Sequence, residues 1–113
     1  MPLMFGFARQ RKALLDAELQ RIVAEFSTLG IERAMLTGDF AEGRVGPETG
    51  LEILVVQQTG RPFHRRPDFF TSHVIPRVAV RWWVYAPEEF EKFASDDPVI
   101  RQALRIGEEL YAA

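Results

Sequence analysis

The sequence of 113 residues contains no cysteine and no long apolar run. Without cysteine the chain has no disulfide bond, no thiol nucleophile and no thiolate metal ligand, and this is compatible with a reducing compartment. No apolar run approaches the roughly 20 residues that cross a bilayer. The apolar opening residues also lack the basic segment and the length of a secretory signal. We therefore expect a cytoplasmic chain without a membrane segment.

The chain also lacks a strong charge of either sign. Its formal net charge is −2, so its overall field favours neither nucleic acid nor an anionic membrane. The one basic cluster, Arg61, Arg65 and Arg66, is interrupted by Pro62 and followed by Pro67. We interpret it as a solvated loop, with a phosphate or RNA contact as the alternative, and we expect no nucleic-acid partner.

The length and composition indicate one small globular domain. A chain of 113 residues is long enough for one hydrophobic core and too short for two. The chain is 47% hydrophobic and 27% charged, the balance of an ordinary globular protein. We take residues 1–113 as a single domain and residues 1–8 as a flexible N-terminal segment. The apolar spacing predicts an amphipathic helix over 13–29, ended by Gly30.

Two apolar segments have the pattern of strands inside a sheet. Leu51–Val56 is almost continuously apolar, which is typical of a strand buried on both faces. Val78–Tyr85 alternates, so that Trp82 and Trp83 point to opposite faces. We predict both as central strands. A third strand is predicted over 31–36, and further helices over 40–43, around 69–74, from Pro87, and from Pro98 to Gly107. We expect the core to include Leu19, Ile22, Ile53, Val55 and Val80.

This order of elements predicts an α/β (α+β) fold in which a small mixed β-sheet is covered by helices. Several of the same segments also resemble the minimal nucleotidyltransferases of the DNA-polymerase-beta-like superfamily. The family's signature is a strand, a glycine motif, and an acidic motif that leads into a hydrophobic strand. This signature is similar to Leu36–Arg44 followed by Thr49–Val56. Val80–Phe90 is similar to its third-carboxylate strand and the next helix. The ending, Asp97–Arg101 with Glu109–Tyr111, is similar to its tail.

The resemblance spans roughly residues 13–111 and implies the nucleotidyltransferase fold. In this family a glycine admits a triphosphate, and three carboxylates hold two magnesium ions for attack on the α-phosphate. Gly38 matches the glycine, and Asp39 stands where the family has serine. Both, with Arg81, are the candidate nucleotide-binding residues. The carboxylate positions fall on Gly50, Glu52 and Arg81, so one ligand of three remains and two-metal catalysis is expected to fail.

An active enzyme would need an unusual acidic set. Asp39 and Glu52 are then the candidate catalytic residues, and Glu52 and Glu48 the candidate metal ligands. The competing interpretation gives each a structural role. Asp39 would cap a short helix over 40–43, Glu48 would be solvated in its loop, and Glu52 would form an ion pair with Arg81.

Three functions therefore stay open. The first is an inactive nucleotidyltransferase-like domain that binds a protein in an antitoxin-like or subunit-pairing role and needs no cofactor. The resemblance implies a small helical partner of the HEPN type, and a homodimer is a further possibility. The second is an active nucleotidyltransferase that uses Mg²⁺ and a nucleoside triphosphate. The third is a metal-free binder of a nucleotide or another anion at Arg81.

Overall fold

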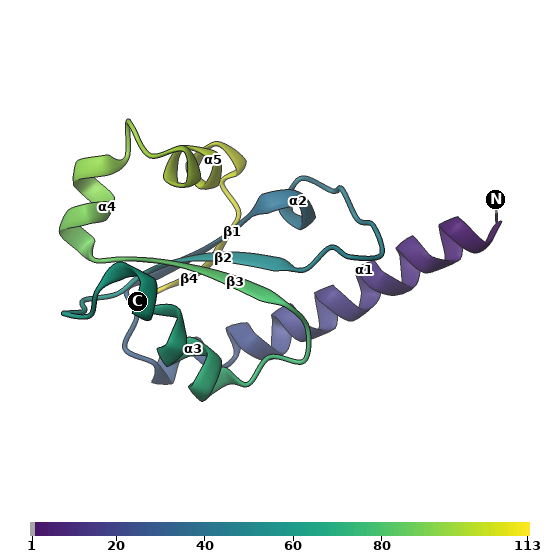
Figure 1. Cartoon of the computed structure of the whole chain (residues 1–113), viewed down its shortest axis with the longest axis horizontal. Helices are drawn as coiled ribbons and strands as arrows, with labels where there is room; N and C mark the ends of the chain where they lie inside the picture. Colours follow the sequence, from purple (N-terminus) through teal and green to yellow (C-terminus); the bar gives the residue numbers. More distant parts are fainter. Residues whose placement is uncertain (1) are drawn as a thin grey trace.

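The computed structural model describes residues 2–113 and the burial of residues from Gly6 onward. Within this range the chain is an α+β protein, as predicted, with five α-helices and one four-stranded sheet (Figure 1). No helix in it is long and apolar enough to cross a membrane. The helices are α1 (Pro2–Val23), α2 (Gly38–Ala41), α3 (Pro67–Val74), α4 (Pro87–Phe93) and α5 (Pro98–Ile106). The strands are β1 (Arg33–Thr37), β2 (Leu51–Val56), β3 (Val80–Tyr85) and β4 (Glu109–Ala112).

The sheet is mixed, in the order β3-β2-β1-β4. Strand β1 runs antiparallel to β2 and β4, whereas β2 and β3 are parallel. The prediction that β2 is central is confirmed, but the same prediction for β3 is wrong, since β3 forms one edge. The fourth strand, β4, was not predicted as a strand, and it pairs with β1 at the opposite edge. A strand of four residues is too short for its apolar pattern to identify it.

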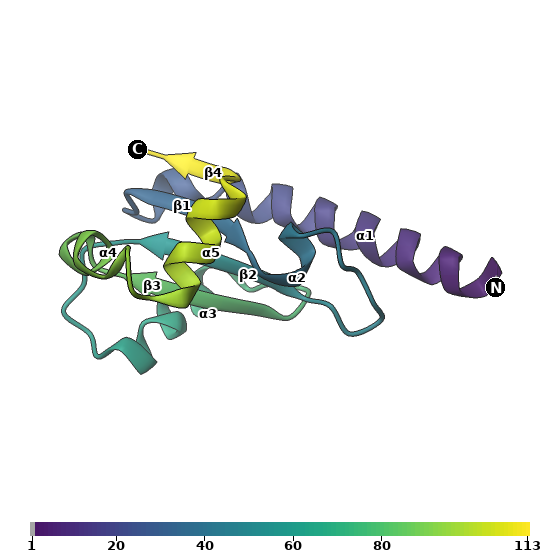
Figure 2. The same ribbon diagram turned by 90° about the horizontal axis from the view of Figure 1, so that it is seen from above.

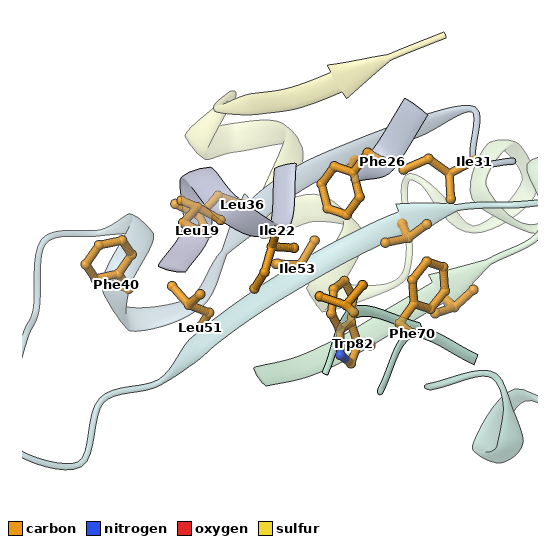
Figure 3. Close-up of a cluster of buried hydrophobic side chains, with 14 of the residues drawn as sticks. Leu19, Ile22, Phe26, Ile31, Leu36, Phe40, Leu51, Ile53, Phe70 and Trp82 are labelled. Carbon is orange, nitrogen blue, oxygen red and sulfur yellow. The ribbon is translucent and has the colours of Figure 1, made fainter. Parts of the chain in front are cut away.

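Helices cover both faces of the sheet (Figures 1 and 2). On one face α1 and α3 pack on the larger core, in which Phe70 stacks on Trp82 at 4.9 Å between ring centroids (Figure 3). On the other face α4 and α5 cover a smaller core that includes Leu54 and Ile100. Leu19, Ile22, Ile53 and Val55 are buried as predicted. Val80 is only partly buried, because it begins the edge strand.

Local signals in the sequence place several helix ends correctly. Asp97 caps α5, accepting hydrogen bonds from two backbone N–H groups of the first turn, and Gly107 ends the helix in the left-handed conformation. Helix α1 begins earlier than predicted, at Pro2, and it also ends earlier, at Val23. The prediction that Gly30 ends it is wrong, because a separate 3-10 turn, Phe26–Thr28, lies between them. Residues 2–8 are therefore helical, Met1 lies outside the described residues, and the flexibility of residues 1–8 stays a prediction. The N-terminal half of α1 extends beyond the body of the domain in both views (Figures 1 and 2).

The basic cluster is not a uniformly solvated loop. Arg61 and Arg65 are exposed, but Arg66 is only 8% exposed. The Arg66 guanidinium donates to Glu89 at 2.6 Å, to the Val84 carbonyl at 3.1 Å and to the Arg61 carbonyl at 2.9 Å. The hydrogen bond from Arg66 lowers the pKa of Glu89. The prediction of a solvated loop is therefore wrong for Arg66. Its partner Glu89 lies on α4, 23 residues away in the sequence, so no local pattern indicates that Arg66 is buried.

A second buried charge joins α1 to the connection between α3 and β3. Glu18 is 5% exposed and accepts two hydrogen bonds from the Arg21 guanidinium, at 2.7 and 2.9 Å. It also accepts the backbone N–H of Arg77. Arg21 in turn donates to the carbonyls of Val74 and Ile75. The hydrogen bond from Arg21 is the main reason that the pKa of Glu18 falls to about 2.

Replacing Arg66 tests the role of its buried guanidinium. We expect Arg66→Ala to lower the free energy of unfolding by about 2–4 kcal/mol, because it leaves the Glu89 carboxylate and the Val84 carbonyl without their donor. Arg65→Ala is the matched control. Arg65 pairs with Asp68 in an exposed ion pair, so its loss should cost less than about 0.5 kcal/mol. Urea denaturation measures both values, and equal effects would contradict the assignment.

The Glu18 network predicts an acid-sensitive stability. The folded chain lowers the pKa of Glu18 from 4.5 to about 2, so the carboxylate stabilises the fold above about pH 4.5. That contribution is lost as the pH falls through this range. Glu18→Gln should therefore lower the free energy of unfolding by about 1–3 kcal/mol at neutral pH. The difference from the unmodified chain should shrink towards pH 2. A difference that does not change with pH would contradict this prediction.

Candidate functional site

An open cavity of about 560 Å³ lies at the N-terminal ends of β2 and β3. All but one of the candidate residues line it: Asp39, Glu48, Glu52 and Arg81. The remaining candidate, Gly38, lies directly against Glu52. The structure thus gathers into one place residues that are up to 43 positions apart in the sequence.

Strand register explains why these residues meet. Thr37 is the β1 partner of Glu52, so Gly38, the next residue, comes beside the start of β2. On the other side of β2, Arg81 of the parallel strand β3 is the partner of Glu52. In parallel strands, partner side chains share one face of the sheet. Glu52 therefore stands between Gly38 and Arg81.

Two glycines at the site are required by close packing. Gly38 has a positive φ of 82°, and a Cβ there would overlap the carboxylate of Glu52. At Gly50 a Cβ would collide with the carbonyl oxygen of Ala79 on the neighbouring segment. The chain thus has no space for a side chain at either position without a movement of the backbone or of Glu52.

The predicted ion pair between Glu52 and Arg81 is not formed. Within residues 2–113, neither side chain has an oppositely charged atom within 4.0 Å. The carboxylate of Glu52 accepts a hydrogen bond from Nε1 of Trp83 at 3.2 Å. The Arg81 guanidinium lies 5.7 Å from the Trp83 ring centroid. The prediction is wrong because Arg81 is exposed on an edge strand, whereas Trp83, two residues further along the same face, offers a donor.

Asp39 does not cap α2 as predicted. Thr37 occupies the N-cap position, and Asp39 lies within the first turn of the helix. Its carboxylate pairs with Arg44, whose Nη2 lies 2.8 Å from Oδ1. The prediction is wrong because α2 begins two residues earlier than predicted, at Gly38 instead of Phe40. Glu48 is exposed in its loop, as the structural interpretation expected.

Sequence reasoning missed Glu42, which lies beside the site at the C-terminal end of α2. It accepts hydrogen bonds from Gln102 at 3.1 Å and Arg105 at 2.9 Å, and it also pairs with Arg44. The hydrogen bond from Gln102, together with the two guanidinium groups, lowers the pKa of Glu42 to about 2. No local pattern could identify it, because two of its partners lie about 60 residues away on α5.

The acidic residues at the cavity do not form a metal-ligand set. Across residues 2–113 no three His, Asp or Glu side chains are placed so that they could hold one metal ion. Asp39 is engaged by Arg44, and Glu52 by Trp83. A comparison of the chain with protein-family models, with curated proteins and with solved structures finds no match. The site is therefore interpreted from its own geometry.

A double-mutant cycle tests the arrangement around Glu52. We expect Arg81→Ala and Glu52→Gln to show a coupling energy below about 0.5 kcal/mol, since the two side chains make no ion pair. Trp83→Phe removes the donor to Glu52 and should lower the free energy of unfolding by about 1 kcal/mol. Urea denaturation of the four chains of the cycle measures the coupling. A coupling energy of several kcal/mol would contradict this arrangement and would indicate an ion pair between Glu52 and Arg81.

Proposed function

We propose that this chain is a nucleotidyltransferase-like domain that has lost two-metal catalysis and acts by binding a protein in the cytoplasm. Its role would be antitoxin-like or that of a pairing subunit, with a small helical protein of the HEPN type as the partner. The proposal rests on the resemblance described above and on the geometry of the cavity. It requires no metal or nucleotide cofactor.

One observation carries the proposal. The three positions at which the resemblance expects carboxylates, Gly50, Glu52 and Arg81, lie together at the start of β2 and β3. Of these three positions, only Glu52 has a side chain that can bind a cation. Gly50 has no side chain, and the Ala79 carbonyl leaves no room for one. Arg81 brings a fixed positive charge without a lone pair. Two magnesium ions would thus find one carboxylate where the mechanism needs three.

The packing at Gly38 supports the same conclusion. The resemblance implies that a triphosphate approaches this glycine. In the structure the carboxylate of Glu52 lies against it, so closely that a Cβ would overlap it. An anionic group at this place repels phosphate unless a metal ion lies between them. The close contact with Glu52 therefore accounts for a glycine at position 38 without a bound phosphate.

Protein binding is supported by the apolar groups that the domain leaves uncovered. Large hydrophobic side chains are exposed at Phe7, Leu14, Phe63, Ile75, Phe93 and Leu104. The projecting half of α1 adds a helical surface that the rest of the domain does not cover (Figure 2). Phe7 and Leu14 are both on α1, where a partner protein can reach them.

A second candidate function, a metal-free anion binder, is favoured by Arg81. Its guanidinium is exposed at the cavity and has no carboxylate within 4.0 Å in the described part of the chain. A guanidinium in this state can donate two parallel hydrogen bonds to a phosphate or carboxylate. Trp83 next to it would report such binding by its fluorescence.

The proposed function predicts that the chain transfers no nucleotide. The test combines Mg²⁺, labelled nucleoside triphosphates, the chain and the product of the neighbouring reading frame in its operon. We expect a complex that survives gel filtration when that product is a small helical protein, and no labelling of either protein. Glu52→Gln should leave both results unchanged. Magnesium-dependent labelling that is lost in Glu52→Gln would instead establish an enzyme that uses Asp39, Glu48 and Glu52.

The same materials separate the second candidate from the first. Binding of ATP without Mg²⁺, followed by tryptophan fluorescence, would favour the anion binder if Arg81→Ala weakens it at least tenfold. Arg101→Ala is the control, because Arg101 is an exposed arginine on α5 outside the cavity. No change in fluorescence at millimolar ATP would rule the anion binder out.

A further inference from the structure

The cavity at the start of β2 and β3 holds two side chains of opposite charge that do not pair with each other. Glu52 and Arg81 are partners in the parallel register, and both line the cavity. Within residues 2–113 no ion pair joins them, since each contacts Trp83 instead. The hydrogen bond from Trp83 reaches one oxygen of the Glu52 carboxylate, which has acceptor sites to spare. A molecule in the cavity can therefore meet both charges.

The cavity continues from these charges onto an apolar wall. Leu51 and Trp82 are buried in this wall, and Pro67 and Val80 are half-buried. The volume of about 560 Å³ lies within the range of small-molecule sites, which is roughly 300–1,000 Å³. The cavity thus offers room for a small molecule with a charged end and a less polar body.

One polar atom of the apolar wall has no partner in the chain. Among residues 6–113, Nε1 of Trp82 is the one buried side-chain nitrogen or oxygen without a hydrogen bond. The Trp82 side chain lines the cavity, although the residue is only 4% exposed. Its nitrogen lies on the side of the ring that faces away from Phe26 and Ile22 in the larger core (Figure 3). Buried donors are almost always hydrogen-bonded, so this N–H indicates an acceptor oxygen on a molecule in the cavity.

We infer that the cavity binds a free amino acid whose side chain carries an acceptor oxygen, as that of glutamine does. The carboxylate of the ligand accepts hydrogen bonds from the Arg81 guanidinium. Its ammonium group donates to the Glu52 carboxylate, and the exposed Glu48 adds a second negative charge nearby. The side chain of the ligand lies along Leu51 and Trp82, and its oxygen accepts the hydrogen bond from Nε1 of Trp82.

The charges of the cavity favour such a zwitterion over a nucleotide. Asp39 is paired with Arg44, which leaves two carboxylates, Glu48 and Glu52, against the guanidinium of Arg81. A polyphosphate would meet more negative than positive charge, whereas a zwitterion finds an opposite charge at each end. The inference does not depend on the proposed function. It differs from the anion binder because it requires Glu52 as well as Arg81.

Titration calorimetry with glutamine and two analogues tests the need for both charged ends. Glutaramic acid lacks the ammonium group of glutamine, and γ-aminobutyramide lacks its carboxylate. We expect each analogue to bind at least about tenfold more weakly than glutamine, because each leaves one charge of the cavity without a partner. If no common amino acid binds at about 10 mM, the inference is wrong. Equal binding of either analogue would also overturn it.

Substitutions at the two charges test where each end of the ligand lies. Arg81→Gln and Glu52→Gln should each weaken the binding of glutamine about tenfold. Arg101→Gln and Glu88→Gln are the matched controls, since both residues are exposed and lie outside the cavity. An anion binder would instead bind its ligand more tightly after Glu52→Gln, because a negative charge is removed. That result, or equal losses in the controls, would contradict the inference.

The indole N–H of Trp82 gives a readout of the third contact. The chain has two tryptophans and so two indole N–H signals in a nitrogen–proton NMR spectrum, and Trp83→Phe identifies that of Trp82. Saturation with glutamine should move the Trp82 signal, because the N–H gains an acceptor. Leucine, which has no side-chain acceptor, should bind more weakly and leave the signal in place. An unchanged signal with glutamine would overturn the contact with Trp82, as would leucine that binds as tightly as glutamine.

Discussion

The position of β2 between β1 and β3 is the constraint on which the rest of the structure depends. Its register with β1 brings Thr37 beside Glu52, and its register with β3 brings Arg81 to the other side of the same residue. Because β2 is apolar along most of its length, both faces of the sheet can carry helices. A shift of the register by one residue would turn Glu52 into the larger core and Ile53 towards the cavity.

Around this strand, several charged side chains take partners that the local sequence does not indicate. Glu52 accepts from an indole N–H, while Arg81, the guanidinium beside it, contacts an aromatic ring. The buried Arg66, which directly precedes α3, pairs with Glu89 on α4. Removal of a charge from water is costly, so a buried charge binds the donor or acceptor that the packing brings nearest. The nearest partner is known only once the elements are packed.

The cavity and helix α1 lie next to each other. The cavity lies where β2 and β3 begin, and its residues are tied into the sheet. Arg11 of α1 donates a hydrogen bond, at 2.9 Å, to the carbonyl oxygen of Thr49, which lines the cavity. The loop that carries Glu48 and Thr49 is therefore held by α1 as well as by the start of β2.

The sequence by itself determined the class of the fold, the central position of β2, the cap at Asp97 and the end of α5 at Gly107. These features follow from local periodicity and backbone preferences, which act within a few residues. Only the tertiary structure decided that β3 lies at an edge, that Arg66 is buried and that Glu52 binds Trp83. These outcomes depend on which side chains meet across the sheet. Such meetings are set by packing between elements far apart in the chain, and no short stretch of sequence encodes them.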